Sequence, residues 1–328
     1  MSTINLIARD NGFGLSRDLR LLQTALTESG HAVTISAVRR GRLRKLGYAW
    51  RAKGGRALRR LRGHDPVAFD VNLMLEHVRS EFFPQARVNV LMPNPEWFLP
   101  ADSAVLSGVD GVFAKTIYTQ GIFAGLGSRV AFTGFTSEDR LDAGVPRERS
   151  FFHLAGRSGT KNTEPLLALW RRHPRWPRLT VVQDRHMAQS AVVAPNIDHR
   201  IGHLSDSELR RLQNSHRFHL CPSQTEGFGH YLVEALSVGA TTLTLDAAPM
   251  NELVTAGRGL LVPVAHTGTQ YLATTNFFDE TAMEAAIERL IGMSDAECER
   301  VGAAARGWFV DNDRAFPDRL DKALRDLV

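Results

Sequence analysis

Short apolar runs recur along the chain, and each is followed by a polar loop and then by apolar residues at helical spacing. In the first third, a helix that Ser16 caps and Gly30 ends is predicted between two such runs. This order of strand, loop, helix and strand is typical of a Rossmann-like α/β domain. The strands that the pattern predicts here are 4–8, 32–38, 71–76, 88–92, 111–116 and 129–134, with a helix over 116–127.

The second half restarts the same pattern after a polar, proline-containing linker at 137–150. Its predicted strands are 151–156, 179–184, 197–204, 218–223 and 241–246, and its helices include 205–214, 280–293 and 294–309. A last helix is predicted from about 314 to 327. The chain therefore divides into a Rossmann-like domain at 1–140, a second one at 150–310, and a C-terminal helix within 311–328.

Composition supports a folded protein of two domains and excludes several classes. The chain has 328 residues, of which 43% are hydrophobic and 23% charged, so bulk disorder is not expected. No apolar run reaches the ~18 residues that span a bilayer, and the first residues lack the pattern of a signal peptide. Two cysteines are too few for a disulfide framework. These features predict a cytoplasmic protein.

The net charge of +5 comes from one segment. Eleven Lys and Arg and no acidic residue lie within 39–62, which leaves 29 basic against 35 acidic residues elsewhere. Trp50 and several leucines are interleaved with these cations, a composition that suits peripheral contact with anionic lipid on the inner face of the membrane. A solvated basic loop is the alternative. Nucleic-acid binding is less favoured, because no recognised nucleic-acid module accompanies the segment.

The most informative stretch is CPSQTEGFGHYLVEALS at 221–237, which predicts a strand, a glycine-containing loop and a helix. Such a loop directs backbone N–H groups and the positive end of a helix dipole toward a ligand, which favours phosphate. Glu226 and Glu234 flank the loop about two helical turns apart. Carboxylates bind sugar hydroxyls well, so the stretch predicts a phosphorylated ligand that carries sugar rings.

This stretch resembles the E-x7-E signature of family 4 retaining glycosyltransferases of GT-B fold. The resemblance implies two Rossmann-like domains that face each other across a cleft, with the C-terminal helix crossing back to the first domain. It also implies transfer of a hexose-type sugar from a nucleotide diphosphate donor, with retention of configuration and without a metal. An ordinary strand-to-helix turn of another doubly wound domain is the alternative reading of the stretch.

The resemblance also implies roles for individual residues. Arg157 and Lys161, in the loop after 151–156, are the candidate cations for the donor diphosphate and, with Glu226, the candidate catalytic residues. Asn162 departs from the family pattern, which has a glycine after the lysine. Further donor-binding candidates are Gly227, Phe228, Gly229 and His230 around the sugar, Glu234 at the ribose, Gly202, His203 and Leu204 at the nucleobase, and Gly12 and Gly14 at the diphosphate.

Polar residues at the ends of 71–76 and 88–92 are expected to line the acceptor side, because ligands of α/β sheets bind at the carboxyl ends of strands. They are Glu76, His77, Asn94 and Glu96. The family often has a histidine near PNPEW, and this chain has none there. Loop residues without a binding role are the alternative.

The sequence thus predicts a cytoplasmic, metal-independent glycosyltransferase. Its expected acceptor is a glycan that is either lipid-linked or part of a cell-surface polysaccharide such as lipopolysaccharide. No metal is expected, because neither His203 nor Asp246 has a second ligand at a suitable spacing. A NAD enzyme is disfavoured, because no acidic residue ends the second strand. Three alternatives remain: a catalytically silent subunit that binds nucleotide sugar, a GT-B epimerase or hydrolase, and a nucleic-acid-binding protein.

Overall fold

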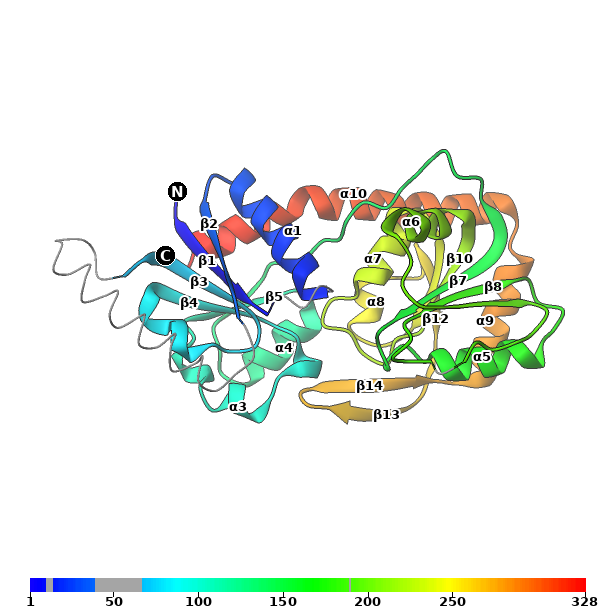
Figure 1. Ribbon diagram of the computed structural model, residues 1–328, viewed down its shortest axis with the longest axis horizontal. Coiled ribbons are helices and arrows are strands. Elements are labelled where there is room, and N and C mark those ends of the chain that lie inside the picture. Colours follow the sequence, from blue (N-terminus) through cyan, green and yellow to red (C-terminus); the bar gives the residue numbers. More distant parts are fainter. Residues whose placement is uncertain (10–13, 39–66, 189) are drawn as a thin grey trace. The chain divides into compact units, whose positions relative to one another are not determined.

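The computed structural model describes residues 1–9, 14–38, 67–188 and 190–328. Two compact units make up the chain (Figure 1): unit 1 contains Met1–Thr136 and Asp313–Val328, and unit 2 contains Ser137–Asn312. Each unit is built on its own sheet with helices around it. Gly12 and the basic segment 39–62 lie outside the described residues, so the predictions made for them are not tested.

Unit 1 contains a six-stranded sheet in which every neighbouring pair of strands is parallel. The strand order β2-β1-β3-β4-β5-β6 reverses direction between β1 and β3, and such a switch point is where ligands bind in open α/β sheets. The strands are β1 (Thr3–Ala8), β2 (Ala32–Ala37), β3 (Phe69–Glu76), β4 (Ala86–Pro93), β5 (Gly111–Ala114) and β6 (Val130–Phe132).

The helix α1 follows β1 and buries the leucine face that the sequence predicts, including Leu19, Leu22 and Leu26. It begins at Gly14, so Ser16 lies in its first turn and the prediction that Ser16 caps it is wrong. The helical elements of unit 1 are α1 (Gly14–Glu28), η1 (Ser80–Gln85), η2 (Pro95–Trp97), α3 (Pro100–Ser103), η3 (Leu106–Gly108) and α4 (Ile117–Gly125).

Unit 2 also contains a six-stranded parallel sheet, in the order β12-β11-β10-β7-β8-β9. Its strands are β7 (Glu148–Gly156), β8 (Leu179–Gln183), β9 (Ile197–Ile201), β10 (His216–Cys221), β11 (Thr241–Leu245) and β12 (Gly259–Val262). Its helices are α5 (Thr163–Arg172), α6 (Asp206–Ser215), α7 (His230–Ser237), α8 (Met250–Leu253) and α9 (Glu280–Gly292). The antiparallel hairpin of β13 (Val264–Gln270) and β14 (Ala273–Phe278) is an element that the sequence analysis missed.

The C-terminal region forms one helix, α10 (Asp295–Arg325), of 31 residues, where the sequence analysis predicted two helices. The helix continues because its buried positions keep helical spacing through the expected break, from Ala305 and Phe309 to Phe316 and Leu320. Pro317 lies inside it. Residues from 313 onward belong to unit 1.

Candidate functional site

The signature stretch forms the predicted strand, loop and helix, with β10 leading through the loop 222–229 into α7. Gly229 precedes the helix in the left-handed region, at a φ of +99°. A Cβ on Gly229 would lie 2.8 Å from Leu232 Cδ1 and 3.3 Å from Leu253 Cδ1. Glycine is therefore required at this position by both backbone conformation and space.

Lys161 and Glu226 meet at the mouth of this loop. The Nζ of Lys161 lies 3.0 Å from Oε1 of Glu226, and the two side chains are 13% and 17% exposed. The hydroxyl of Ser223 donates to the same carboxylate oxygen. The Tyr231 ring lies under the ammonium, 3.1 Å from Nζ to the ring centroid. The structure thus brings together two of the three predicted catalytic residues, partly open to solvent.

Tyr231 completes the support of this pair. Its hydroxyl is hydrogen-bonded to the Ser223 hydroxyl, and burial raises the pKa of Tyr231 well above its ordinary value. The phenol therefore stays neutral at physiological pH. Neither Ser223 nor Tyr231 was predicted as a site residue, although both lie within the signature stretch.

Asn162 ties the loop that carries Lys161 to the signature loop. It adopts the left-handed conformation at a φ of +51°, which glycine and asparagine tolerate best, so the departure from the family pattern keeps the backbone shape. Its side-chain amide donates to Pro222 O at 2.9 Å, and its Oδ1 accepts from Gln224 Nε2 at 3.0 Å. The side chain thus adds a connection that glycine lacks.

Arg157 lies at the same edge of the sheet, beside the end of β8. Its Nε is 3.6 Å from Oδ2 of Asp184, and its Nη2 is 3.5 Å from Nδ1 of His186. The side chain is 40% exposed. These contacts connect Arg157 to the loop after β8, whereas Lys161 contacts the signature loop.

Glu234 lies inside unit 2, with 1% of its surface exposed. Its Oε2 accepts a hydrogen bond of 2.7 Å from Gln213, whose Oε1 accepts one of 2.9 Å from Arg140. Arg140 in turn donates to Asp206 at 2.7 Å. The two glutamates of the signature therefore have different environments, since Glu226 faces a partly open loop and Glu234 is buried against Gln213.

The remaining donor-side candidates are spread around the same unit, except Gly14, which is the first residue of α1 in unit 1. Gly202 has a φ of +129° just after β9, and His203 is exposed. Leu204 packs on the buried cluster around Phe152. In the signature loop, Gly227 precedes buried Phe228, whose ring meets that of His230 edge-on, and His230 Nδ1 is 2.5 Å from Ser137 Oγ.

In unit 1, the acceptor-side candidates Glu76, His77 and Asn94 lie together at the carboxyl ends of β3 and β4. Nε2 of His77 is 3.4 Å from the Glu76 carboxylate, and its Nδ1 is 2.9 Å from that of Asp102. Glu76 has a φ of +67°, which is uncommon for this residue type. Burial raises its pKa, against the opposing effects of His77, Lys115 and Asn94. Glu96 is buried in the following turn η2.

A buried ion pair lies beneath this cluster. Nζ of Lys115 is 2.5 Å from Oδ2 of Asp18 and 3.2 Å from Oδ1 of Asn94, and Lys115 and Asp18 are each 3% exposed. Asp18, Asp102 and Lys115 were not predicted as site residues. Lys115 directly follows β5, so the strand-end argument used for Glu76 would have found it.

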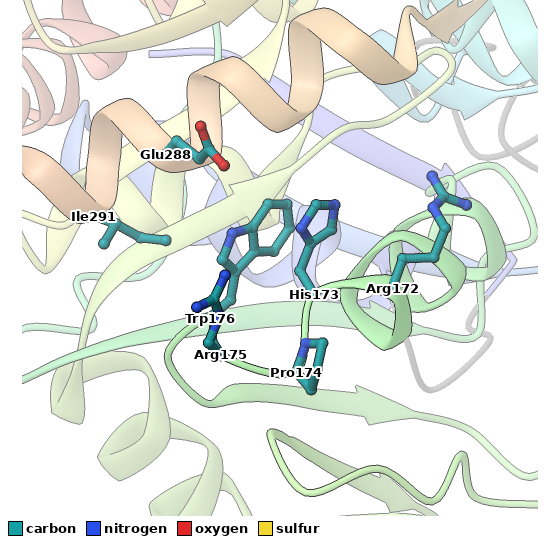
Figure 2. Close-up of a pocket in the computed structure, with 7 residues that line it drawn as sticks. All are labelled: Arg172, His173, Pro174, Arg175, Trp176, Glu288 and Ile291. Carbon is teal, nitrogen blue, oxygen red and sulfur yellow. The ribbon is translucent and has the colours of Figure 1, made fainter.

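A cavity of about 350 Å³ lies elsewhere in unit 2, near the amino end of β8 (Figure 2). The ring of His173 stacks on that of Trp176 at a centroid distance of 4.0 Å, and Glu288 and Ile291 from α9 complete its lining. None of the predicted site residues lines this cavity. It therefore does not belong to the candidate site.

Two absences hold for the part of the chain that the structure describes. Within it, no three His, Cys, Asp or Glu side chains are grouped to hold a metal ion. No helix in the same part of the chain has the length and apolar character to cross a bilayer.

Comparison with known proteins gives a match for the second half of the chain. Residues 186–308 match the model of the family described as glycosyl transferases group 1. No curated protein sequence is detectably similar to the chain. The matched residues contain the signature loop, Glu226 and Glu234, whereas Arg157 and Lys161 precede them.

Solved structures match over nearly the whole length. Sucrose-phosphate synthase from Thermosynechococcus elongatus has a TM-score of 0.72 at 13% identity and covers 100% of this chain and 99% of its own. Anabaena HepE in complex with UDP-glucose has the same TM-score and identity, with 100% of both chains covered. The E. coli trehalose-6-phosphate protein bound with UDP-2-fluoro glucose matches with a TM-score of 0.68, 13% identity and 99% coverage of both chains.

These matches confirm the predicted fold class, two parallel α/β units of the GT-B type. They also confirm the family resemblance at the level of the domain, while the roles of single residues stay predictions. Residues 186–308 are thus similar to the group 1 glycosyl transferases, and the chain as a whole has the GT-B fold.

Proposed function

We propose that the protein transfers a hexose-type sugar from a nucleotide diphosphate donor to a glycan acceptor, with retention of configuration and without a metal ion. The observation that carries this proposal is the contact between Lys161 and Glu226 at the mouth of the glycine loop. The loop lies in the matched glycosyltransferase domain. Two of the similar structures contain UDP-glucose or a fluorinated analogue, which favours a nucleotide-sugar donor here.

Donor binding uses the partial exposure of this pair. Without donor, the Lys161 ammonium and the Glu226 carboxylate neutralise each other. A diphosphate draws the ammonium to itself, which leaves the carboxylate to accept hydrogen bonds from the sugar hydroxyls. The backbone N–H groups around Gly227, Phe228 and Gly229 bind the same sugar, with His230 beside them.

Lys161 and Arg157 also stabilise the leaving group. As the bond from the anomeric carbon to the phosphate oxygen breaks, negative charge grows on the nucleoside diphosphate. A fixed cation in a partly desolvated site stabilises that charge more in the transition state than in the ground state. The acceptor oxygen forms the new bond to the anomeric carbon, and its proton goes to an oxygen of the leaving phosphate.

The other donor-side residues bind the nucleoside. Glu234 accepts hydrogen bonds from the ribose hydroxyls, and it exchanges part of its hydrogen bonding to Gln213 when it does so. Backbone around Gly202, His203 and Leu204 binds the nucleobase. For Gly12 and Gly14, a role at the diphosphate is proposed from the sequence resemblance alone, because Gly12 lies outside the described residues.

The acceptor is bound by unit 1, where Glu76, His77, Asn94 and Glu96 offer carboxylate, imidazole and amide groups to sugar hydroxyls. A lipid-linked or cell-surface polysaccharide acceptor is proposed from the basic segment 39–62 alone, through contact with anionic lipid. A membrane-peripheral location of the protein is proposed from the same segment, and a cytoplasmic one from the two cysteines and the lack of a long apolar run.

The test combines donor binding with product analysis. Calorimetry with UDP-glucose, GDP-mannose, dTDP-glucose and their nucleoside diphosphates identifies the donor, and acceptor glycans are then screened with it. A sugar–acceptor product with unchanged anomeric configuration supports the proposal. Donor binding without turnover on any acceptor identifies a silent subunit, and conversion of donor alone identifies an epimerase or hydrolase. Either result overturns the transferase assignment.

A further inference from the structure

A second cavity of unit 2, of about 410 Å³, lies at the sheet edge opposite to the signature loop. Arg147 directly precedes β7, and Arg217 is the second residue of the neighbouring strand β10. The signature loop follows the other end of β10, which at about 3.3 Å per residue places the two sites roughly 20 Å apart. The cavity is therefore separate from the proposed donor site.

Its lining carries an excess of positive charge. Arg147, Arg217 and Arg306 line it together with one acidic residue, Glu299. Burial lowers the pKa of Arg147, and repulsion from the like charge of Arg217 lowers it further. An anion between them would relieve that repulsion.

Two of the three arginines are already committed to the protein. Arg147 donates to the backbone oxygens of Asn214, Val238 and Gly239. Arg306 donates to both carboxylate oxygens of Asp139 and to the backbone oxygen of Ser237. These two residues therefore supply positive potential without offering many hydrogen atoms to a ligand.

Arg217 is different. Its Nε is buried and has no hydrogen-bond partner among the residues that the structure describes. A buried donor without a partner is unfavourable, so a small movement of the guanidinium that brings this N–H to an acceptor oxygen in the cavity is favourable. Arg217 is thus the group through which an anion would be recognised.

We propose that this cavity binds a small phosphorylated compound, held by Arg217 in the field of Arg147 and Arg306. A planar guanidinium can donate two parallel hydrogen bonds to phosphate oxygens, which a lysine ammonium cannot do. The volume lies within the usual range for small-molecule sites and exceeds what a bare phosphate needs, so the ligand is a phosphate monoester with an organic body.

The position of the cavity links it to the signature helix. Arg306 and Arg147 hold the backbone oxygens of Ser237, Val238 and Gly239 at the carboxyl end of α7. The other end of α7 follows the glycine loop, and Glu234 lies within the helix. A phosphate in this cavity therefore lies close to the carboxyl end of the helix that carries the proposed donor site.

The test is calorimetry of the whole chain with inorganic phosphate and with glycerol 3-phosphate. Wild type, Arg217→Gln and the control Arg211→Gln, an exposed position on α6, are compared. Loss of the hydrogen bonds from Arg217 should weaken glycerol 3-phosphate binding by at least about tenfold, with no change in the control. Equal affinity in all three proteins, or no binding to wild type, overturns the proposal.

Two more variants separate this site from the donor site and from misfolding. Lys161→Ala removes a proposed donor cation, and glycerol 3-phosphate binding should survive in it. Ala303→Glu places a carboxylate at an exposed position of the cavity lining, and it should weaken binding as Arg217→Gln does. Loss of binding in Lys161→Ala, or full binding in Ala303→Glu, would assign the anion to another site and sink the proposal.

Discussion

At the carboxyl end of each sheet, a lysine faces a carboxylate, but the two pairs differ in how far they are exposed to solvent. In unit 1, the Lys115 ammonium is 3% exposed and is bound by Asp18 and Asn94. In unit 2, the Lys161 ammonium is 13% exposed and shares a contact with Glu226 at 17% exposure. Both lysines face a carboxylate near a strand end, and we expect only Lys161 to exchange its partner for a ligand.

This difference separates a structural role from a functional one. The two charges of a buried pair stay together, because either charge left alone inside the protein is highly unfavourable. A partly exposed pair loses less free energy when it separates, because water and ligand compensate each charge for its lost partner. We therefore expect changes at Lys115 to affect stability first, and changes at Lys161 to affect activity first.

The largest effect is expected from breaking the buried pair. Lys115→Met removes the ammonium that faces the buried Asp18 carboxylate and should destabilise the protein by about 3–5 kcal/mol, measured from urea unfolding. Lys161→Met, the matched control, should change stability by about 1 kcal/mol or less, because its partner is partly exposed. The double variant Asp18→Leu/Lys115→Met should recover most of the loss. Equal losses of stability at the two lysines would contradict the proposed difference between the two pairs.

Turnover should show the reverse order. Lys161→Ala removes a cation that stabilises the leaving diphosphate and should lower kcat by about 100-fold or more, with a smaller change in KM. Arg157→Ala should lower it less, because Arg157 is 40% exposed and lies beside Asp184. Steady-state kinetics with the identified donor measure both. Full activity in Lys161→Ala would contradict the proposed catalytic role.

Within unit 2, the two glutamates allow the comparison to be sharpened. Glu234→Gln keeps the size of the side chain but loses its charge, and it should weaken donor binding by about 1.5–3 kcal/mol, or roughly 10- to 150-fold. Calorimetry with the nucleoside diphosphate and with the full donor locates the loss. A loss seen with the nucleoside diphosphate too fits ribose binding. Glu164→Gln, exposed on α5, is the control that should bind normally.

As the pH falls, unit 2 should lose stability before unit 1 does. Burial lowers the pKa of His153 to about 4 and that of His219 to about 3, below the ordinary value of 6.5. Their stabilisation is complete above pH 6.5 and is lost as the pH falls toward 4 and 3. Each adds a slope of up to about 1.4 kcal/mol per pH unit. The raised pKa of Glu76 acts in the opposite direction, because its contribution is complete below pH 4.5 and is lost at higher pH.

Hydrogen exchange between pH 7 and 4.5, corrected for the intrinsic rates, measures the two units separately. Peptides of β7 and β10, which contain His153 and His219, should lose protection on acidification while peptides of β3 do not. His219→Gln should reduce the effect in unit 2. Uniform loss of protection in both units would show that these histidines do not set the acid sensitivity.

Much of the fold could be predicted because its signals are local. The apolar runs of β1, β3, β4, β8, β10 and β11 and the leucine face of α1 are visible as periodicity within a few residues. The hairpin β13–β14 was missed, because its first strand is largely exposed and shows no apolar alternation. The break expected before 314 was wrong, since the buried stripe of α10 continues past it.

The sequence by itself determined the signature loop, its two glutamates and the neighbouring lysine loop, because each is a contiguous stretch with a strand, a turn and a helix. Only the tertiary structure decided which side chains meet. Lys161 and Glu226 are 65 residues apart, and Lys115 and Asp18 are 97 apart. Such pairs form because β7 lies beside β10 in one sheet and α1 packs on β1 and β2 in the other. Burial, which made one lysine structural and left the other open, depends on those neighbours and has no local signal.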